Sequence, residues 1–356
     1  MNKGATGRVM LAEPQVTEAR PGVHAHSIPQ PLEWSGVLAQ KGYVFGVDIS
    51  GDGERVVLAD LSGNIVGRSG EAHRPASEEA STAPDQVVER VLGMMRALLK
   101  EHHVKPREVL RAAVGFGGPV DALRGHVRMH HDAPGWEGFP LAQKLESGLD
   151  VPTFLENDAR LAALGEVWFG AGRDTAECDM VYVHWSTGVG GGIVTGGKLL
   201  RGASTIAGEV GHTVVRTGDD ALPCRCGGKG HLEAYIRGTA LITRARTLLG
   251  EGEAPADIEA LFAQPDPNSA LQPLLDEVVA LLGVTVANLI TQINPNLVVI
   301  GGSVARHAGP LIPRISDLAL QSAMSVSADG VTIVPAELGD EATVMGAVAL
   351  ALDSLR

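Results

Sequence analysis

Short apolar segments that end in glycine-containing turns constrain the fold of this chain more than any other feature. Residues 43–49, 109–116 and 180–183 each have the apolar, β-branched composition of a buried strand, and glycine follows each within a few residues. Residues 84–100 place apolar side chains at i, i+3 and i+4 spacing, which predicts an amphipathic helix. Strands that alternate with helices in two such series predict an α/β fold with two lobes.

The same patterns set the expected lobe boundaries. We expect a small lobe over residues 42–165, closed by a C-terminal helix over 342–356, and a large lobe over 166–341. Residues 1–41, which four prolines interrupt, are expected to form a flexible extension or an arm along one edge. The other expected strands and helices cover residues 55–60, 65–67, 140–146, 151–155, 158–168, 271–292 and 297–300.

Composition excludes several classes of protein. A hydrophobic fraction of 44% over 356 residues can build a core, which excludes global disorder. The formal charge of −13 argues against general affinity for nucleic acid or an anionic membrane. No apolar stretch is expected to reach the ~20 residues of a membrane span, and no secretory signal is recognised. Three cysteines cannot form a disulfide framework, so a cytoplasmic location is expected.

Asp158 is the first candidate for catalysis. It follows a predicted strand and opens a predicted helix, and open α/β sheets bind ligands at that position. A carboxylate there can take the proton from a sugar hydroxyl that attacks phosphorus, while Asn157 can bind neighbouring hydroxyls. Asn and Asp are also preferred helix caps, so a purely structural role is the alternative.

A glycine-rich segment, Ser186 to Gly192, follows the strand that begins at Met180. Successive glycines let backbone N–H groups converge on an anion, and Thr187 adds a hydroxyl donor. The segment lacks the lysine of a Walker A loop and does not fit the dinucleotide fingerprint. It therefore favours phosphate contact, with a plain hairpin turn as the alternative.

Four metal-ligand residues lie within a 20-residue window: His212, Cys224, Cys226 and His231. Two histidines and two cysteines form a closed tetrahedral zinc set, and the glycines between them allow tight wrapping. The alternative is two reduced cysteines beside ordinary histidines. Zinc would also hold the nearby Glu209 and Glu233 as acceptors for sugar hydroxyls, whereas each taken singly could be a solvated side chain.

These segments, in this order, resemble the ROK family (repressor, open reading frame, kinase) from about Tyr43 to the C-terminus. Any one match is weak, and the ordered set is specific. The matching segments are 46–49, 115–121, 134–136, 156–159, 186–192, 209–212, 224–233, 301–302 and 339–340.

The resemblance implies a two-lobed actin/hexokinase-type (ribonuclease-H-like) fold, with sugar and ATP in the cleft between the lobes. It implies Asp158 as the catalytic base, and His212 as a ligand of both zinc and sugar through different ring nitrogens. Mg²⁺, structural zinc and a homodimer or homotetramer are also implied. The implied sugar contacts are Gly118, Asn157, Asp158, Glu209, His212 and Glu233. The implied nucleotide contacts are Ser50, Gly51, Thr187, Gly188, Gly190, Gly301 and Gly302.

Two positions depart from the family pattern. His231 stands where the family usually has cysteine, and histidine is an equally good zinc ligand. The first phosphate loop of the family's kinases reads Asp-x-Gly-Gly-Thr-Lys, but here Asp52 and Gly53 occupy the last two positions. An aspartate near phosphates is unfavourable unless a cation lies between them, and such loops resemble those of the family's regulators.

The regulators carry an N-terminal winged helix-turn-helix, which residues 1–41 are not expected to supply. We therefore favour an ATP-dependent kinase that phosphorylates the primary hydroxyl of a hexose or hexose-like substrate. The alternative is a catalytically weak sugar-sensing protein without the DNA-binding domain.

Overall fold

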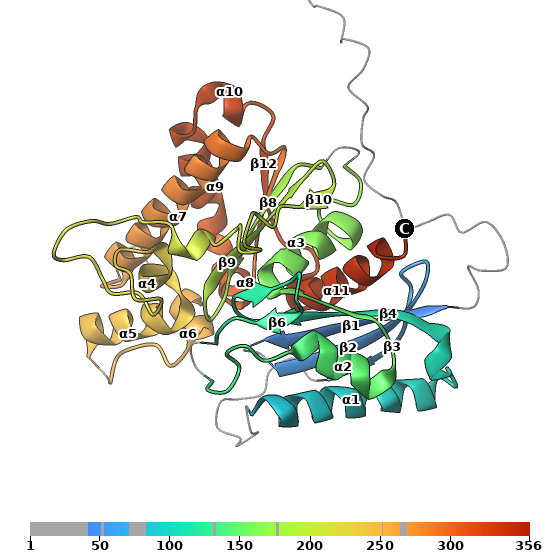
Figure 1. Cartoon of the computed structure of the whole chain (residues 1–356). Coiled ribbons are helices and arrows are strands. Elements are labelled where there is room, and N and C mark those ends of the chain that lie inside the picture. The colour runs from blue at the N-terminus through green and yellow to red at the C-terminus, as the bar shows by residue number, and fades with distance from the viewer. Residues whose placement is uncertain are drawn as a thin grey trace, which may run out of the picture.

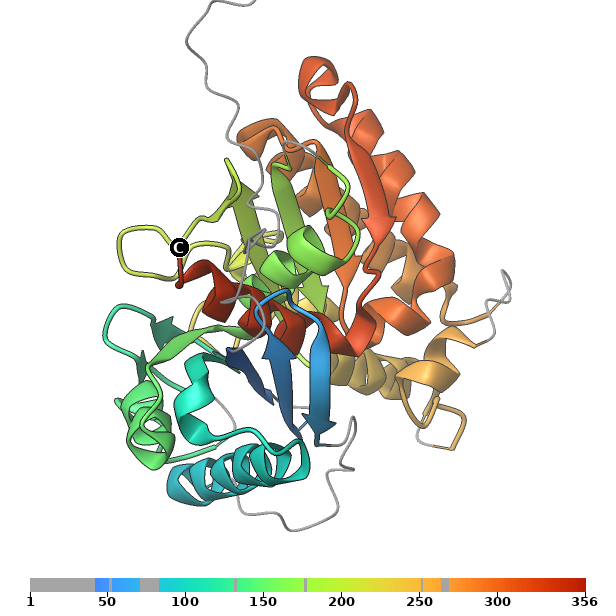
Figure 2. The same cartoon turned by 90° about the vertical axis from the view of Figure 1, so that its right-hand side faces the viewer.

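Two five-stranded mixed sheets form the framework of the molecule (Figures 1 and 2). The computed structural model describes residues 42–50, 53–70, 83–130, 133–175, 178–250, 252–263 and 269–356. The first sheet has the order β3 (Ile65–Ser69), β2 (Gly53–Asp60), β1 (Tyr43–Ser50), β4 (Val109–Phe116) and β7 (Thr153–Asn157). The second has the order β10 (Lys198–Leu199), β9 (Val189–Thr195), β8 (Met180–Trp185), β11 (Leu297–Gly301) and β12 (Thr332–Pro335).

The two sheets share one topology. In each, three antiparallel strands run consecutively along the chain, and two further strands then join in parallel. Strand β1 therefore corresponds to β8, and the β1–β2 hairpin corresponds to the β8–β9 hairpin. Parallel strands bring their carboxyl ends to one edge of a sheet, so both sheets present turns and helix starts at a comparable edge.

The helices cover the faces of the two sheets. In the first lobe α1 (Pro84–Glu101) and α2 (Leu141–Leu149) pack on one face, and the small hairpin β5 (Val120–Asp121) and β6 (His126–Val127) lies beside them. The helices of the second half are α4 (Leu232–Ile236), α5 (Gly238–Leu249), α6 (Ile258–Phe262), α7 (Gln272–Ile293), α8 (Ser303–His307), α9 (Ile312–Ser322) and α10 (Ser325–Ala328). Short 3₁₀ turns cover Pro106–Glu108, Val210–His212, Gly309–Leu311 and Gly339–Glu341.

Helices α3 (Asp158–Phe169) and α11 (Ala342–Asp353) lie between the two sheets (Figure 1). Their apolar residues form one buried cluster with residues of both sheets. Glycine makes the approach possible: a Cβ on Gly346 would lie 1.7 Å from the carbonyl oxygen of Leu161, and one on Gly165 would lie 2.4 Å from that of Ala342. Only glycine fits such a backbone-to-backbone contact.

Helix α7 is the one helix among the described residues that is long and apolar enough to cross a membrane by length and composition. This corrects the expectation that no stretch is long enough. Of its most apolar window, 61% is buried inside the molecule, and its apolar side chains belong to the large cluster of the second lobe. Burial on this scale is that of a core helix.

Most expected elements are confirmed, with boundaries that shift by at most three residues. Strand β7 begins at Thr153 rather than residue 151, because Pro152 has no N–H and contributes only its carbonyl, which accepts from Ala112 N at 2.9 Å. The expected glycine loop at 186–192 is mostly strand β9, and only residues 186–188 form the turn. Residues 1–41 lie outside the described residues.

Candidate active site

A cleft runs along the carboxyl-end edges of both sheets. It is lined by the ends of β1 and β4, the β8–β9 turn, and the starts of α3, α8 and α11. The structure brings almost all the residues expected from the sequence into this cleft. Those that line it are Ser50, Gly118, Asn157, Asp158, Thr187, Gly188, Gly190, Glu209, His212, Glu233 and Gly302.

Of the described residues expected to contact the nucleotide, Gly301 stands apart from the cleft lining. Gly51 lies outside the described residues, as does Asp52. Gly301 is the last residue of β11 and is buried; a Cβ there would lie 2.3 Å from the hydroxyl oxygen of Tyr182, so its glycine serves close packing. Gly302 does line the cleft, with a φ of +101° that favours glycine.

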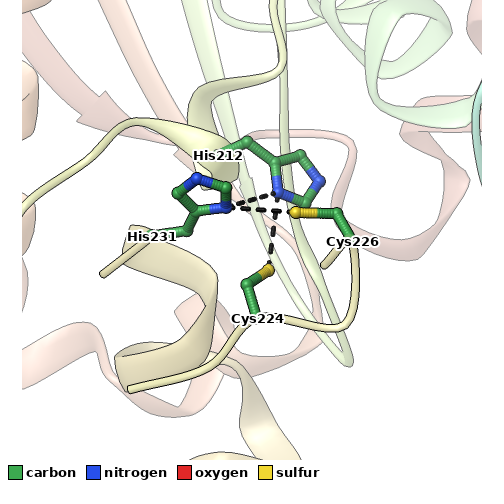
Figure 3. A group of neighbouring side chains, drawn as sticks. All are labelled: His212, Cys224, Cys226 and His231. Carbon is green, nitrogen blue, oxygen red and sulfur yellow. Dashed lines mark hydrogen bonds between the residues drawn. The ribbon is translucent and has the colours of Figure 1, made fainter. Parts of the chain in front are cut away.

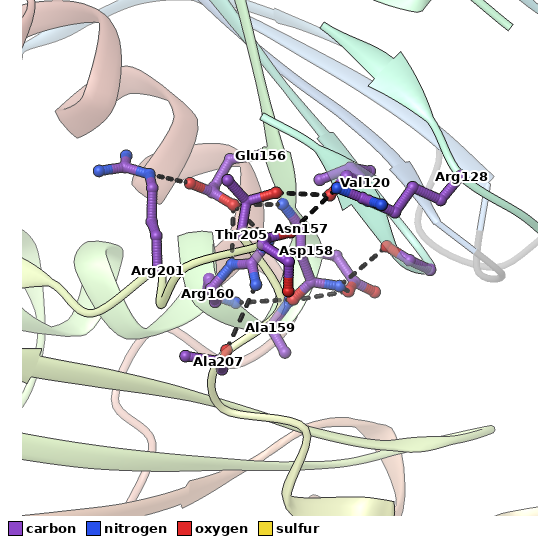
Figure 4. Close-up of polar contacts among 12 residues, drawn as sticks. Val120, Arg128, Glu156, Asn157, Asp158, Ala159, Arg160, Arg201, Thr205 and Ala207 are labelled. Atoms are coloured by element: carbon purple, nitrogen blue, oxygen red, sulfur yellow. Dashed lines mark hydrogen bonds and ion pairs between the residues drawn. The ribbon is translucent and has the colours of Figure 1, made fainter. Parts of the chain in front are cut away.

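Asp158 is held at the first residue of α3 (Figure 4). Its Oδ1 accepts from the backbone N–H of Ala159 at 2.8 Å and from the side-chain amide of Asn157 at 2.9 Å. That amide also donates to the carbonyl oxygen of Gly118 at 3.2 Å, while Asn157 Oδ1 caps α3 by accepting from Arg160 N at 3.1 Å. Asn157 is thus a helix cap, and the same contacts fix the carboxyl group of Asp158 in the cleft wall.

A buried ion-pair network lies under the start of α3 (Figure 4). Glu156 is fully buried; it pairs with Arg160 at 2.7 Å through one oxygen and with Arg201 at 2.6 Å through the other. Arg160 also donates to the carbonyl oxygen of Ala207 at 3.3 Å. The sequence patterns do not predict this network, because it joins Glu156 in strand β7 to Arg160 in the first turn of α3 and to Arg201, 45 residues further on.

The loop after β10, which contains Arg201 and Ala207, also reaches across to the first lobe. Thr205, itself buried with a φ of +60°, donates its hydroxyl to the carbonyl oxygen of Val120 at 3.0 Å. Arg128 donates to the carbonyl oxygen of Ser204 at 3.1 Å. These contacts bridge the two lobes beside the start of α3.

Asp48 and Arg55 form a second charged pair in the cleft, and the sequence analysis did not single out Arg55. They lie directly opposite each other in the β1–β2 register, and Arg55 donates to Asp48 Oδ2 at 2.9 Å. Burial raises the pKa of Asp48 to about 7; Arg55 acts to lower it, and the nearby Asp158 carboxylate raises it further. Counting residues outward from the β1–β2 turn would have identified the pair.

The β8–β9 turn closes the cleft on the second side. Ser186 donates its backbone N–H to the carbonyl oxygen of Gly188 at 2.8 Å, and its hydroxyl lies 2.7 Å from that of Ser303 at the start of α8. Glu233, buried in the first turn of α4, accepts from the backbone N–H of Val189 at 3.2 Å. The hydroxyls of Ser186 and Ser303 therefore join the turn to α8, and the carboxylate of Glu233 joins the start of β9 to α4.

Glu209 and His212 lie next to Asp158 in the cleft. Burial raises the pKa of the Glu209 carboxyl, and the Asp158 and Glu233 carboxylates add to the increase, against the opposing effect of His212 and Arg160. The Nε2 atom of His212 lies 4.0 Å from the Glu209 carboxylate. His212 therefore turns Nε2 toward this group.

The other ring nitrogen of His212 faces the four-residue cluster that includes Cys224, Cys226 and His231 (Figure 3). The four ligand atoms all lie within 4.8 Å of one another. His212 Nδ1 is 3.4 Å from His231 Nδ1 and 3.6 Å from Cys224 Sγ, and Cys226 Sγ is 3.2 Å from His231 Nδ1. Tetrahedral zinc with its usual bond lengths separates such ligand atoms by roughly 3.3–3.8 Å, so the cluster has the dimensions of a zinc site.

Comparison with known proteins agrees with this geometry. The sequence matches the ROK family over residues 44–354. It is 31% identical over 322 residues to a glucokinase of Halalkalibacterium halodurans, over 87% of this chain and 94% of that protein. It is 28% identical over 325 residues to a putative xylose repressor of Caldicellulosiruptor sp., over 88% of this chain and 79% of that protein.

A solved structure gives the corresponding result for the fold. The crystal structure of a ROK family glucokinase from Streptomyces griseus, in complex with glucose and AMPPNP, superposes with a TM-score of 0.69 at 28% identity. The match covers 88% of this chain and all of that one. The expected two-lobed actin/hexokinase-type α/β fold is confirmed. The chain belongs to the ROK family, which also includes the glucokinases and the putative repressor named above.

Proposed function

We propose that this protein transfers the terminal phosphoryl group of ATP to the primary hydroxyl of a hexose or hexose-like sugar, with Asp158 as the general base. The observation that carries the proposal is the placement of Asp158. Its carboxyl group is fixed by Ala159 N and Asn157, and it lines the same cleft as the β8–β9 turn and Glu209.

Each cleft residue has a defined task in this reaction. Asn157, Glu209, His212 and Glu233 bind sugar hydroxyls, with Gly118 as a close backbone neighbour. Asp158 takes the proton of the primary hydroxyl as its oxygen attacks phosphorus in line. Backbone N–H groups and hydroxyls of the β8–β9 turn, at Thr187, Gly188 and Gly190, contact the phosphates, with Ser50 facing them from β1 and Gly302 beside the nucleoside. Contacts from Gly51 and Gly301 stay predictions.

Mg²⁺ enters this scheme with the nucleotide. Asp48 Oδ1 is a buried carboxylate oxygen with no partner among the described residues, and carboxylate oxygens are ligands that Mg²⁺ prefers. The ion would neutralise phosphate charge when bound. Asp48 is therefore the residue that we assign to hold it.

Zinc is proposed as a structural ion at His212, Cys224, Cys226 and His231. The cluster dimensions support this assignment, and the loop glycines fit it: a Cβ on Gly228 would lie 2.4 Å from the ring of His231. Zinc on Nδ1 of His212 would fix the ring and leave Nε2 for the sugar. The bound ion would also hold α4, and with it Glu233, at the cleft.

A regulatory protein that binds sugar without efficient turnover is the second candidate. Its support is the likeness to the xylose repressor and the Asp52–Gly53 sequence of the first loop. Residues Gly51 and Asp52 of that loop lie outside the described residues.

We also propose that the protein is a cytoplasmic homodimer or homotetramer and that it does not bind nucleic acid.

A coupled assay of ADP release over a panel of hexoses, amino sugars and carbocyclic sugar analogues tests the kinase proposal. Asp158→Asn, which keeps the size of the side chain, is the matched control. We expect sugar-dependent turnover in the wild-type protein and a large loss in the variant. Wild-type turnover no higher than that of Asp158→Asn on every sugar would refute the kinase and favour the regulator.

A further inference from the structure

Arg55 is a buried cation in the cleft whose hydrogen-bonding capacity is almost unused. Its side chain is 8% exposed, and its one polar contact among the described residues is the bond from Nη1 to Asp48 Oδ2 at 2.9 Å. Within the described part of the chain, Arg55 Nε and Asp48 Oδ1 are both buried without a partner. A guanidinium offers five N–H donors in a rigid fork, so most of the Arg55 fork has no acceptor among the residues that the structure describes.

Buried donors without acceptors are costly and therefore rare, and at a cleft they indicate a ligand that supplies the acceptors. An anion with two or more oxygens is the ligand whose acceptors match the fork.

The position of Arg55 identifies the part of the cleft that this anion occupies. Among the described lining residues, the arginines are Arg55 and Arg225, and there is no lysine. Arg225 lies between Cys224 and Cys226, two residues of the proposed zinc cluster. It pairs with Glu233 at 3.4 Å, on the side of the cleft formed by the second sheet and its loops. Arg55 is thus the cation of the first side, on the hairpin whose loop has Gly53 where the family's kinases have lysine.

We propose that Arg55 is a catalytic residue that contacts the terminal phosphoryl group of the donor and takes over, from strand β2, the cationic role that Gly53 cannot fill. This proposal rests on the kinase function proposed above. In the transfer, the bond between the β–γ bridging oxygen and the γ-phosphorus breaks, and a bond from the sugar oxygen forms. The hydroxyl proton goes to Asp158, and ADP leaves with the bonding electron pair. Arg55 keeps its protons and stabilises charge on the phosphoryl oxygens.

Three variants test this role. Arg55→Met removes the charge, Arg55→Lys keeps the charge without the fork, and Asp48→Asn/Arg55→Met leaves no unpaired buried charge if the single variant fails to fold. Arg90→Met is the matched control, because Arg90 pairs with Glu54, the next residue of β2, on the face that packs against α1. Thermal unfolding of each variant separates folding defects from catalytic ones.

The measurements are the kcat and sugar KM from ADP release, and calorimetric binding of ADP and of the non-hydrolysable analogue AMPPNP. For Arg55→Met we expect kcat to fall about 100-fold or more, with sugar KM within about two-fold. AMPPNP binding should weaken about ten-fold, and ADP binding should stay the same, because ADP lacks the phosphate that Arg55 contacts. Arg55→Lys should recover part of the loss, and Arg90→Met should match the wild type.

Different results would overturn different proposals. Wild-type kcat in Arg55→Met, or an equal loss of ADP and AMPPNP affinity, overturns the role of Arg55 and leaves the kinase in place. A wild-type protein without turnover on any sugar overturns the kinase. In that case the comparison of ADP with AMPPNP still decides whether Arg55 contacts a terminal phosphate. A wild-type protein that binds neither nucleotide overturns both.

Discussion

The β1–β2 and β8–β9 hairpins occupy the same place in two sheets of the same topology, yet they use different chemistry at the cleft. In the first, the charged pair Asp48 and Arg55 lies across the ladder. In the second, Gly191 is paired with Val183, and Gly190 with His184. One hairpin therefore presents a side-chain ion pair to the cleft, and the other presents backbone.

The glycines of the second hairpin have a further cause that their pattern did not reveal. A Cβ on Gly192 would lie 2.5 Å from the Cβ of Ala163, and one on Gly190 would lie 2.9 Å from that of Ala159. These contacts let α3 lie directly on β9. Several glycines in what looked like a phosphate loop are thus required by helix packing, and residues 186–188 alone make the turn.

The largest expected effect is at Asp158, which lies in the cleft that both hairpins border. Asp158→Asn should lower kcat about 1,000-fold and leave sugar binding within a few-fold, because the amide keeps the contacts to Ala159 N but cannot take a proton. Steady-state ADP release and sugar binding by calorimetry check this. Equal losses in kcat and in sugar affinity would show that Asp158 binds sugar rather than acting as a base.

Metal removal tests the second side of the cleft alone. Cys226→Ser should reduce zinc content from one equivalent per chain to well below one and weaken sugar binding by 10-fold or more, since the ligand loop positions Glu233 and His212. Metal analysis and calorimetry measure both. Cys178→Ala is the control for loss of a thiol outside the cluster and should keep full zinc. Zinc well below one equivalent in the wild-type protein contradicts the assignment.

Gly192→Ala tests whether the second hairpin needs its glycines for packing. The added methyl group would clash with Ala163 on α3, so we expect the free energy of unfolding to fall by about 1–3 kcal/mol. Gly93→Ala, in α1 with nothing within 4 Å of the added Cβ, should instead raise it by about 0.5–1 kcal/mol. Chemical denaturation measures both. If Gly192→Ala leaves the free energy of unfolding unchanged, packing does not explain this glycine, and ligand contact becomes its expected role.

A pH dependence of stability is expected in the first hairpin. The pKa of Asp48 is about 7 in the folded protein and 3.8 in its ordinary state, so the folded protein binds more protons between these values. This contribution to stability is present in full below about pH 4 and is lost as the pH rises through 7. The Tm of Asp48→Asn, relative to that of the wild type, should therefore increase between pH 5 and 7. Above pH 8 the difference between the two Tm values should stay constant. Parallel Tm curves over this range would contradict the raised pKa.

The sequence predicted well those features that depend on neighbouring residues. The helix over 84–101 and the strand over 109–116 follow from periodic apolar residues within one segment, and the four metal-ligand residues lie within one short window. The Asp158 motif was also local. These signals are visible without knowledge of which segments meet in space.

Features that depend on register or on contacts between distant segments escaped the sequence analysis. Arg55 is a cleft residue only because β1 and β2 pair with Asp48 opposite it. Glu156 is buried only because Arg201, 45 residues further on, completes its pairing. The role of Gly301 in packing against Tyr182 depends on β11 lying beside β8.

The contact between α3 and α11 has a consequence for the order in which the protein becomes active. The hydroxyl of Thr343 in α11 donates to the carbonyl oxygen of Asp158 at 3.3 Å, and Thr343 and Asp340 both line the cleft. The ribosome adds Asp158 to the growing chain long before it adds Asp340 and Thr343. Nascent chains, and truncated products that end before residue 342, should therefore lack phosphotransfer activity even when both sheets have formed.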